Sequence, residues 1–152
     1  MNMDLKNTIN QDIKTAMKAK DQAALRALRA IKSAIIIAET AEGRNGESLS
    51  DEEGLKLLTK QAKQRKDSLA QYEANNREDL AMVESEELAI IERYLPKQLT
   101  SEEIEAEVKS IIEQVGASSM KDMGKVMGAA TKKMAGRADG KVISQLVRQL
   151  LG

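Results

Sequence analysis

The sequence predicts an all-α protein, and three observations support this prediction. The chain of 152 residues has no Phe or Trp and only two Tyr, so its core has to be aliphatic, which suits helices better than sheets. Strong helix formers dominate the composition, and Pro96 is the single proline. Apolar residues also recur at three- and four-residue spacing, which is the period of an amphipathic helix.

Four helices are expected in residues 1–96. The first ends near Lys20, and Asp21 is placed to cap the second. A capping box, Ser50-Asp51-Glu52-Glu53, opens the third helix, and Asn75-Asn76 ends it. The fourth has to end before Pro96. The apolar positions that define these helices are Leu5, Ile9, Ile13 and Met17; Ala24, Leu25, Leu28, Ile31 and Ile35; Leu55, Leu58, Ala62, Leu69 and Tyr72; and Leu80, Val83, Leu88, Ile91 and Leu95.

Three more helices are expected in residues 97–152. A second capping box at 100–103 opens the first of them, and Gly116 is a plausible C-cap. The next starts at serines 118–119 and runs to Gly136, and Asp139 can cap the last. We therefore expect two domains, a four-helix N-terminal domain at 1–96 and a three-helix C-terminal domain at 97–152.

Positive charge is concentrated near the C-terminus of a chain whose net charge is zero. Residues 116–152 carry seven basic and two acidic side chains, whereas residues 97–115 carry two basic and five acidic ones. The stretch 121–141 also holds four of the nine glycines. Clustered cations beside flexible backbone are typical of phosphate binding. The candidate RNA-binding residues are Lys121, Lys125, Lys132, Lys133, Arg137 and Lys141, and the glycines beside them are Gly124, Gly128, Gly136 and Gly140.

A helical wheel at about 100° per residue separates this stretch into faces. Lys121, Lys125 and Lys132 share one stripe, and Gly124 and Gly128 lie between them and an apolar stripe. Arg137 and Lys141 flank the start of the last helix, where free N–H groups attract anions. The alternative is structural, because glycines four apart permit close helix packing and lysine rows are usually solvated. The apolar stripe, which we expect to face the core, is Met120, Met123, Met127, Ala130 and Met134.

Composition excludes several classes of site. Cysteine and histidine are absent, which removes thiolate nucleophiles, disulfides, zinc sites built on these residues and the commonest general base. We therefore expect no catalytic residue, no metal site and no cofactor. No apolar run approaches the roughly 20 residues that span a membrane, and the N-terminal segment lacks the apolar stretch of a signal peptide, so a cytoplasmic protein is expected.

The sequence also resembles a known family. Residues 124–151, with the motif GRADGK, resemble the tail domain of the B subunit of the glutamine-dependent Asp/Glu-tRNA amidotransferase. The whole chain resembles the stand-alone YqeY proteins of the GatB/YqeY family, through AALRALRAIKSAI (23–35), KQRKDSLAQYE (63–73) and ERYLPKQLTSEEI (92–104). The resemblance implies a two-part helical protein whose tail domain helps to hold tRNA. The matching positions are Gly124, Lys125, Gly128, Lys132, Lys133, Gly136, Arg137 and Lys141.

Three functions follow as hypotheses. The first is an accessory protein that binds tRNA or other structured RNA without catalysis of its own. The second is an adaptor for an amidotransferase, a synthetase or the ribosome. The third, implied by the resemblance, is a carbon–nitrogen ligase with glutamine as amido-N donor, although the kinase-like catalytic part and the zinc-ligand cysteines of many B subunits are missing. The docking surfaces of an adaptor, or simply solvated helix faces, are Arg26, Arg29 and Lys32, and Lys56, Lys60 and Lys63.

The densest acidic cluster is Glu84, Glu86 and Glu87. Carboxylate oxygens are ligands that Mg²⁺ accepts, so the cluster could in principle hold this ion. The simpler interpretation is that the three glutamates form the solvent-exposed face of the fourth helix.

Overall fold

The computed structural model describes residues 4–152 and contains seven α-helices, one short 3₁₀ turn and no strand within that range. The all-α prediction is therefore confirmed. Contacts divide the chain into two compact units, the first ending at Leu95 and the second comprising Pro96–Gly152. No helix in the described part of the chain combines the length and apolar character needed to cross a membrane.

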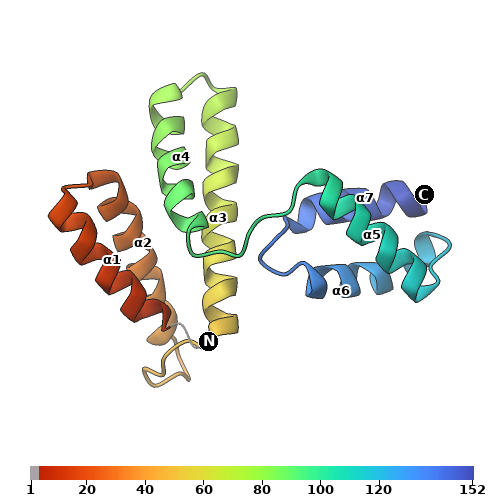
Figure 1. Ribbon diagram of the computed structural model, residues 1–152, viewed down its shortest axis with the longest axis horizontal. Helices are drawn as coiled ribbons and strands as arrows, with labels where there is room; N and C mark the ends of the chain where they lie inside the picture. The colour runs from red at the N-terminus through yellow and green to blue at the C-terminus, as the bar shows by residue number, and fades with distance from the viewer. Residues whose placement is uncertain (1–3) are drawn as a thin grey trace. The chain divides into compact units, whose positions relative to one another are not determined.

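The first unit consists of two helical hairpins. Helices α1 (Leu5–Ala19) and α2 (Gln22–Glu39) form one hairpin, and α3 (Asp51–Ala74) and α4 (Glu78–Glu92) form the other (Figure 1). Helix α2 packs against α4, which joins the hairpins around a core of aliphatic residues. Helix α4 ends three residues earlier than its apolar pattern suggests, so that Leu95 follows the helix as a half-buried residue.

Helix starts in this unit follow the sequence closely, because capping is a local interaction. The Asp21 carboxylate accepts a hydrogen bond from the Ala24 N–H at 3.1 Å, as expected for the cap of α2. Both halves of the predicted Ser50–Glu53 capping box are present. The backbone N–H of Ser50, followed by the Arg44 side chain, holds the pKa of the Glu53 carboxyl below its usual range. The first helix ends where Lys20 adopts a left-handed conformation with φ of 57°.

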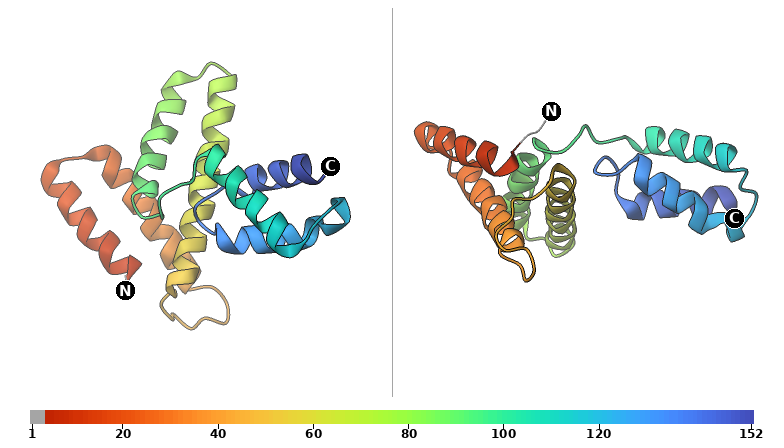
Figure 2. Two further views of the ribbon diagram at one scale, coloured as in Figure 1. Left: turned by 45° about the vertical axis from the view of Figure 1, so that its right-hand side comes forward. Right: turned by 90° about the horizontal axis from the view of Figure 1, so that it is seen from below.

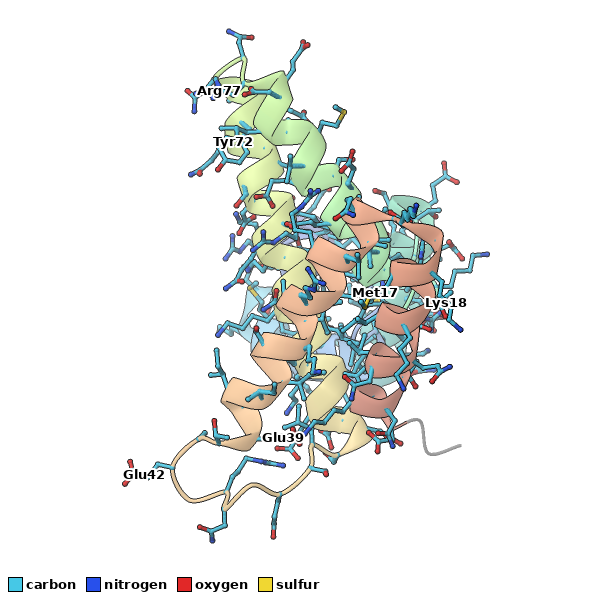
Figure 3. All side chains as sticks on the ribbon, turned by 90° about the vertical axis from the view of Figure 1, so that its left-hand side faces the viewer. Met17, Lys18, Glu39, Glu42, Tyr72 and Arg77 are labelled. Atoms are coloured by element: carbon cyan, nitrogen blue, oxygen red, sulfur yellow. The ribbon has the colours of Figure 1, made fainter. Side chains whose placement is uncertain are left out.

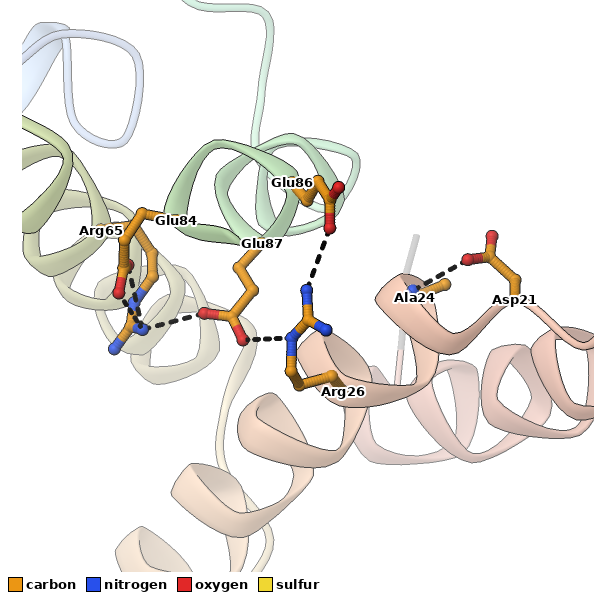
Figure 4. Close-up of polar contacts among 7 residues, drawn as sticks. All are labelled: Asp21, Ala24, Arg26, Arg65, Glu84, Glu86 and Glu87. Carbon is orange, nitrogen blue, oxygen red and sulfur yellow. Dashed lines mark hydrogen bonds and ion pairs between the residues drawn. The ribbon is translucent and has the colours of Figure 1, made fainter. Parts of the chain in front are cut away.

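An internal charge network connects α2, α3 and α4 (Figure 4). One oxygen of Glu87 accepts from Arg26 Nε at 3.2 Å, and the other accepts from Arg65 Nη1 at 2.9 Å. Arg65 also pairs with Glu84 at 3.2 Å, and Arg26 with Glu86 at 3.0 Å. Only 8% of Glu87 and 12% of the Glu84 side chain are exposed. The interpretation of these glutamates as a solvent-exposed face is therefore wrong for Glu84 and Glu87, whose carboxylates are occupied by arginines.

The apolar pattern of α1 also overestimates burial at one position. Ile9 is fully buried, whereas Met17, two turns later, is exposed (Figure 3). At the other end of the α1–α2 hairpin, Glu39 is buried and pairs with Lys6 Nζ at 3.0 Å. The hairpin thus combines an aliphatic seam with one ion pair that closes its open end.

The second unit packs three helices around its own aliphatic core (Figure 2). They are α5 (Ser101–Val115), α6 (Met123–Lys133) and α7 (Gly140–Leu151), and the 3₁₀ turn η1 (Met120–Asp122) precedes α6. The capping box at 100–103 and the left-handed C-cap Gly116 are both present, as predicted. The most deeply buried side chains are Val108, Val126, Ala130, Met134, Ile143 and Val147.

We expect Glu87→Gln to lower the free energy of unfolding of the first unit by about 1–3 kcal/mol, because a neutral amide cannot balance two guanidinium groups. Urea unfolding followed by tyrosine fluorescence measures this unit alone, since Tyr72 and Tyr94 are the only aromatic residues. Glu86→Gln is the control, because Glu86 is more exposed and contacts only Arg26. Its effect should stay below about 1 kcal/mol, and equal losses in both variants would contradict the prediction.

Candidate nucleic-acid interface

Helix α6 has one buried and one exposed face. Val126 and Ala130 are fully buried, and Met123 and Met127 pack partly against the same core. The predicted methionine stripe is therefore correct in part. Met120 is wrong, because it lies in η1 before the helix begins and is 44% exposed. Val126 lies at the centre of the buried face but is absent from the predicted stripe, although its four-residue spacing to Ala130 is a helical signal.

The opposite face of α6 exposes bare backbone. Gly124 and Gly128 are both exposed, and a Cβ atom added to either would meet no atom within 4 Å. Close helix packing is therefore the wrong explanation for these two glycines. Neither is held at positive φ, and glycine within a helix costs about 0.5–1 kcal/mol relative to alanine. The fold itself thus gives no reason for glycine at these positions.

Six cations lie near these glycines in the sequence, within residues 121–141, and the structure separates them by their partners. Lys133 pairs with Glu107 of α5 at 2.8 Å, and Lys125 Nζ donates to the carbonyl oxygen of Val115 at 3.4 Å. The remaining four cations are exposed and form no ion pair with any described residue. We call the whole set the glycine–lysine face: Gly124 and Gly128 with Lys121, Lys125, Lys132, Lys133, Arg137 and Lys141.

Hydrogen bonds fix the loop between α6 and α7, which carries Arg137. Gly136 adopts a φ of 74°, and the Arg137 N–H donates to the Met134 carbonyl at 2.9 Å to close a turn. The carbonyl of Gly136 accepts from Gln98 Nε2 at 2.7 Å, and that of Arg137 accepts from the Leu99 N–H at 2.8 Å. The segment after Pro96 therefore holds the GRADGK loop. No local sequence signal pairs residues so far apart in the chain.

The N-terminus of α7 does not present all of its backbone N–H groups to an anion. Asp139 caps the helix as predicted, but its carboxylate accepts from the Lys141 N–H at 2.9 Å. One of the N–H groups that could bind a phosphate is therefore already paired, and the cap brings a negative charge. Lys141 contributes to the interface through its exposed side chain.

Lys97 is a further cation, outside the predicted set of RNA-binding residues. The backbone N–H and hydroxyl of Thr100 hold the pKa of the Glu103 carboxyl below its usual range, and the positive charges of Lys97 and Arg137 add to this shift. Both cations thus lie close enough to the start of α5 to act on Glu103. Lys97, like Arg137, is exposed.

Within residues 4–152, no group of three or more Asp, Glu, His or Cys side chains is arranged to hold a metal ion. The two carboxylate oxygens of Glu87 accept hydrogen bonds from arginines, so they are not available as ligands.

Comparison with known proteins supports a family assignment. The profile of a family described as Yqey-like protein matches residues 6–151. The chain is similar to proteins named altered inheritance of mitochondria protein 41, mitochondrial, from three fungi. Identity is 43% over 90 residues in Meyerozyma guilliermondii, covering 59% of this chain and 45% of the relative. Identity is 29% over 148 residues in Pyrenophora tritici-repentis, covering 95% of this chain and 79% of the relative. Identity is 35% over 104 residues in Saccharomyces cerevisiae, covering 67% of this chain and 55% of the relative. The match thus spans about half the length of the first and third relatives.

We expect Gly124→Ala and Gly128→Ala to stabilise the second unit by about 0.5–1 kcal/mol each, because alanine favours the helix and its methyl group has open space. Thermal unfolding followed by circular dichroism measures the change. Gly136→Ala is the control, and it should be destabilising because this residue has a positive φ. A loss of stability in the α6 variants would show that these glycines have a structural role.

Proposed function

The chain belongs to the Yqey-like protein family, and we propose that it is an accessory protein that binds structured RNA, tRNA above all, through the glycine–lysine face and without catalysis of its own. The observation that carries the proposal is the exposed backbone at Gly124 and Gly128, with the exposed Lys125 and Lys132 on the same helix. A helix surface without side chains allows a sugar–phosphate backbone to approach closely, and the cations beside it neutralise the phosphates.

The second unit contains no aromatic residue, and this limits the kinds of RNA that it can recognise. Sequence-specific readers of single strands stack unpaired bases on aromatic rings, or on arginine. The only aromatic residues, Tyr72 and Tyr94, lie in the first unit, where Tyr72 is near the α3–α4 turn (Figure 3). The glycine–lysine face therefore suits charge and shape recognition of paired RNA. The resemblance of residues 124–151 to the amidotransferase tail domain makes tRNA the first candidate.

A second function, protein-interaction adaptor, is favoured by one observation on the first unit. Among the described residues, four of the five exposed large apolar side chains belong to it: Met17, Ile36, Ile37 and Met82. Ile37 is 71% exposed, although it lies in a regular helix. Exposed apolar groups on a helical surface fit a protein partner better than an RNA. Capture of the same partner with and without nuclease treatment would distinguish an adaptor from an RNA-binding protein.

We expect the intact chain to bind bulk tRNA with a strong salt dependence. Each phosphate contact contributes about −0.7 to −0.9 to the slope of log affinity against log salt concentration. Reversing the charge at Lys132, Lys133 and Arg137 together should weaken binding and reduce this slope by about one per lost contact. A filter-binding or fluorescence-anisotropy titration at several salt concentrations measures both quantities.

The matched control is charge reversal at Lys56, Lys60 and Lys63, which changes the net charge equally but lies on α3. Affinity should fall only slightly in this variant. Gly124→Ala with Gly128→Ala should also weaken tRNA binding, while the protein becomes more stable. Equal affinity in the wild type and the Lys132, Lys133 and Arg137 variant would reject the proposed interface.

In the free protein Glu107 pairs with Lys133, and this pairing competes with a phosphate for the lysine. Removal of the carboxylate should therefore raise the affinity for tRNA. We expect Glu107→Gln to increase it about twofold to fivefold, in the range of a partly exposed ion pair. Glu105→Gln is the control, because Glu105 lies on the same helix but pairs with Lys109. A similar increase in both variants would mean that only the net charge matters and that Lys133 makes no specific contact.

A further inference from the structure

The first unit contains a cavity that has no part in the proposed RNA interface. It lies between α1, α2 and the residues that follow α4, and its volume is about 330 Å³. The polar lining consists of Asp12, Thr15, Asp21, Arg93 and Tyr94. All of these residues precede Pro96, so the cavity belongs to the first unit alone.

The floor of the cavity is apolar. Ala16, Ala24 and Leu28 line it, and all three are buried members of the core. Alanine methyl groups from two adjacent helices leave space where larger side chains would fill the gap between α1 and α2. A floor of this kind can cover the methylene groups of an aliphatic chain but offers no polar partner.

The rim presents mainly hydrogen-bond acceptors. One oxygen of Asp12 accepts from the Tyr94 hydroxyl, and burial together with this carboxylate raises the pKa of Tyr94, so the phenol remains the donor. One oxygen of Asp21 accepts from the Ala24 N–H (Figure 4). The Thr15 hydroxyl donates to the Gln11 carbonyl at 3.3 Å. Each of these groups keeps lone pairs for a ligand, because a carboxylate has a second oxygen and a hydroxyl can also accept.

The charge of the rim determines the kind of ligand. Two carboxylates and one guanidinium line the cavity, and no ion pair joins Arg93 to either carboxylate within the described residues. We propose that the cavity binds a primary alkyl ammonium group, with its N–H donors on Asp12 and Asp21 and its methylene groups over Ala16 and Leu28. An ammonium has three donors and no acceptor, which complements this rim. A free polyamine and the lysine side chain of a partner protein both carry this group.

The test uses the full-length Tyr72→Phe variant, in which Tyr94 is the only fluorophore, titrated with n-butylammonium at constant ionic strength. We expect a saturable change in tyrosine fluorescence and in the chemical shift of the Ala24 amide. Asp21→Asn should weaken binding about twofold to fivefold, because asparagine keeps the helix cap but loses the charge. Asp4→Asn is the matched control, since Asp4 caps α1 in the same way and does not line the cavity.

Arg93→Gln provides a test of opposite sign, because removal of the only cation at the rim should strengthen butylammonium binding. The proposal is overturned if no saturable change occurs, if n-butanol binds equally well, if Asp4→Asn weakens binding as much as Asp21→Asn, or if Arg93→Gln abolishes it. Spermidine and a capped peptide with one lysine then distinguish the two sources. The tighter ligand identifies whether the cavity serves a free amine or a partner protein.

Discussion

Both units depend on aliphatic cores that contain no aromatic ring among their buried residues, and this constraint shapes the rest of the structure. Aliphatic side chains bury less area each than aromatic ones, so the helices have to approach closely and the cores remain small. The second unit, Pro96–Gly152, is of the size at which one core gives only marginal stability. Its hydrogen bonds from Gln98 and Leu99 to the loop before α7 therefore matter, because they add to the few core contacts that Leu99 and Ala138 make at this connection.

The two units use charge in different ways. In the first, Arg26 and Arg65 are bound to glutamates that join the two hairpins, so charge contributes to the fold. This also alters the hypothesis of a docking surface at Arg26, Arg29 and Lys32, since Arg26 is already engaged. In the second unit, Lys133 alone of the α6 lysines pairs with a carboxylate. Cations that hold no protein partner beside exposed backbone are free to meet an external anion, which is why the second unit is the better candidate for RNA.

The agreement between sequence and structure follows the range of the interactions. The caps at Asp21, Ser50, Thr100 and Asp139 could be predicted, because each involves residues within four positions of one another. A helical period also shows which residues share a face, but not which face is buried. The supposed solvent-exposed glutamates failed for this reason, since tertiary neighbours decide which face is buried. In the methionine stripe only Met120 is wrong, because the helix begins after it. The contact between Gln98 and Gly136 could not be predicted at all, because it joins distant parts of the chain.

The exposed glycines have a consequence for the dynamics of the interface. Helix α6 has 11 residues and carries two interior glycines, which together cost about 1–2 kcal/mol of helix stability. The glycines make no side-chain contact that offsets this loss, so the stability of α6 depends on its buried face, centred on Val126 and Ala130. A phosphate backbone that binds only the helical form of α6 would stabilise that form by mass action. RNA binding and the ordering of α6 are therefore coupled. The measured affinity is lower than the intrinsic affinity of the ordered helix, because binding also has to order α6.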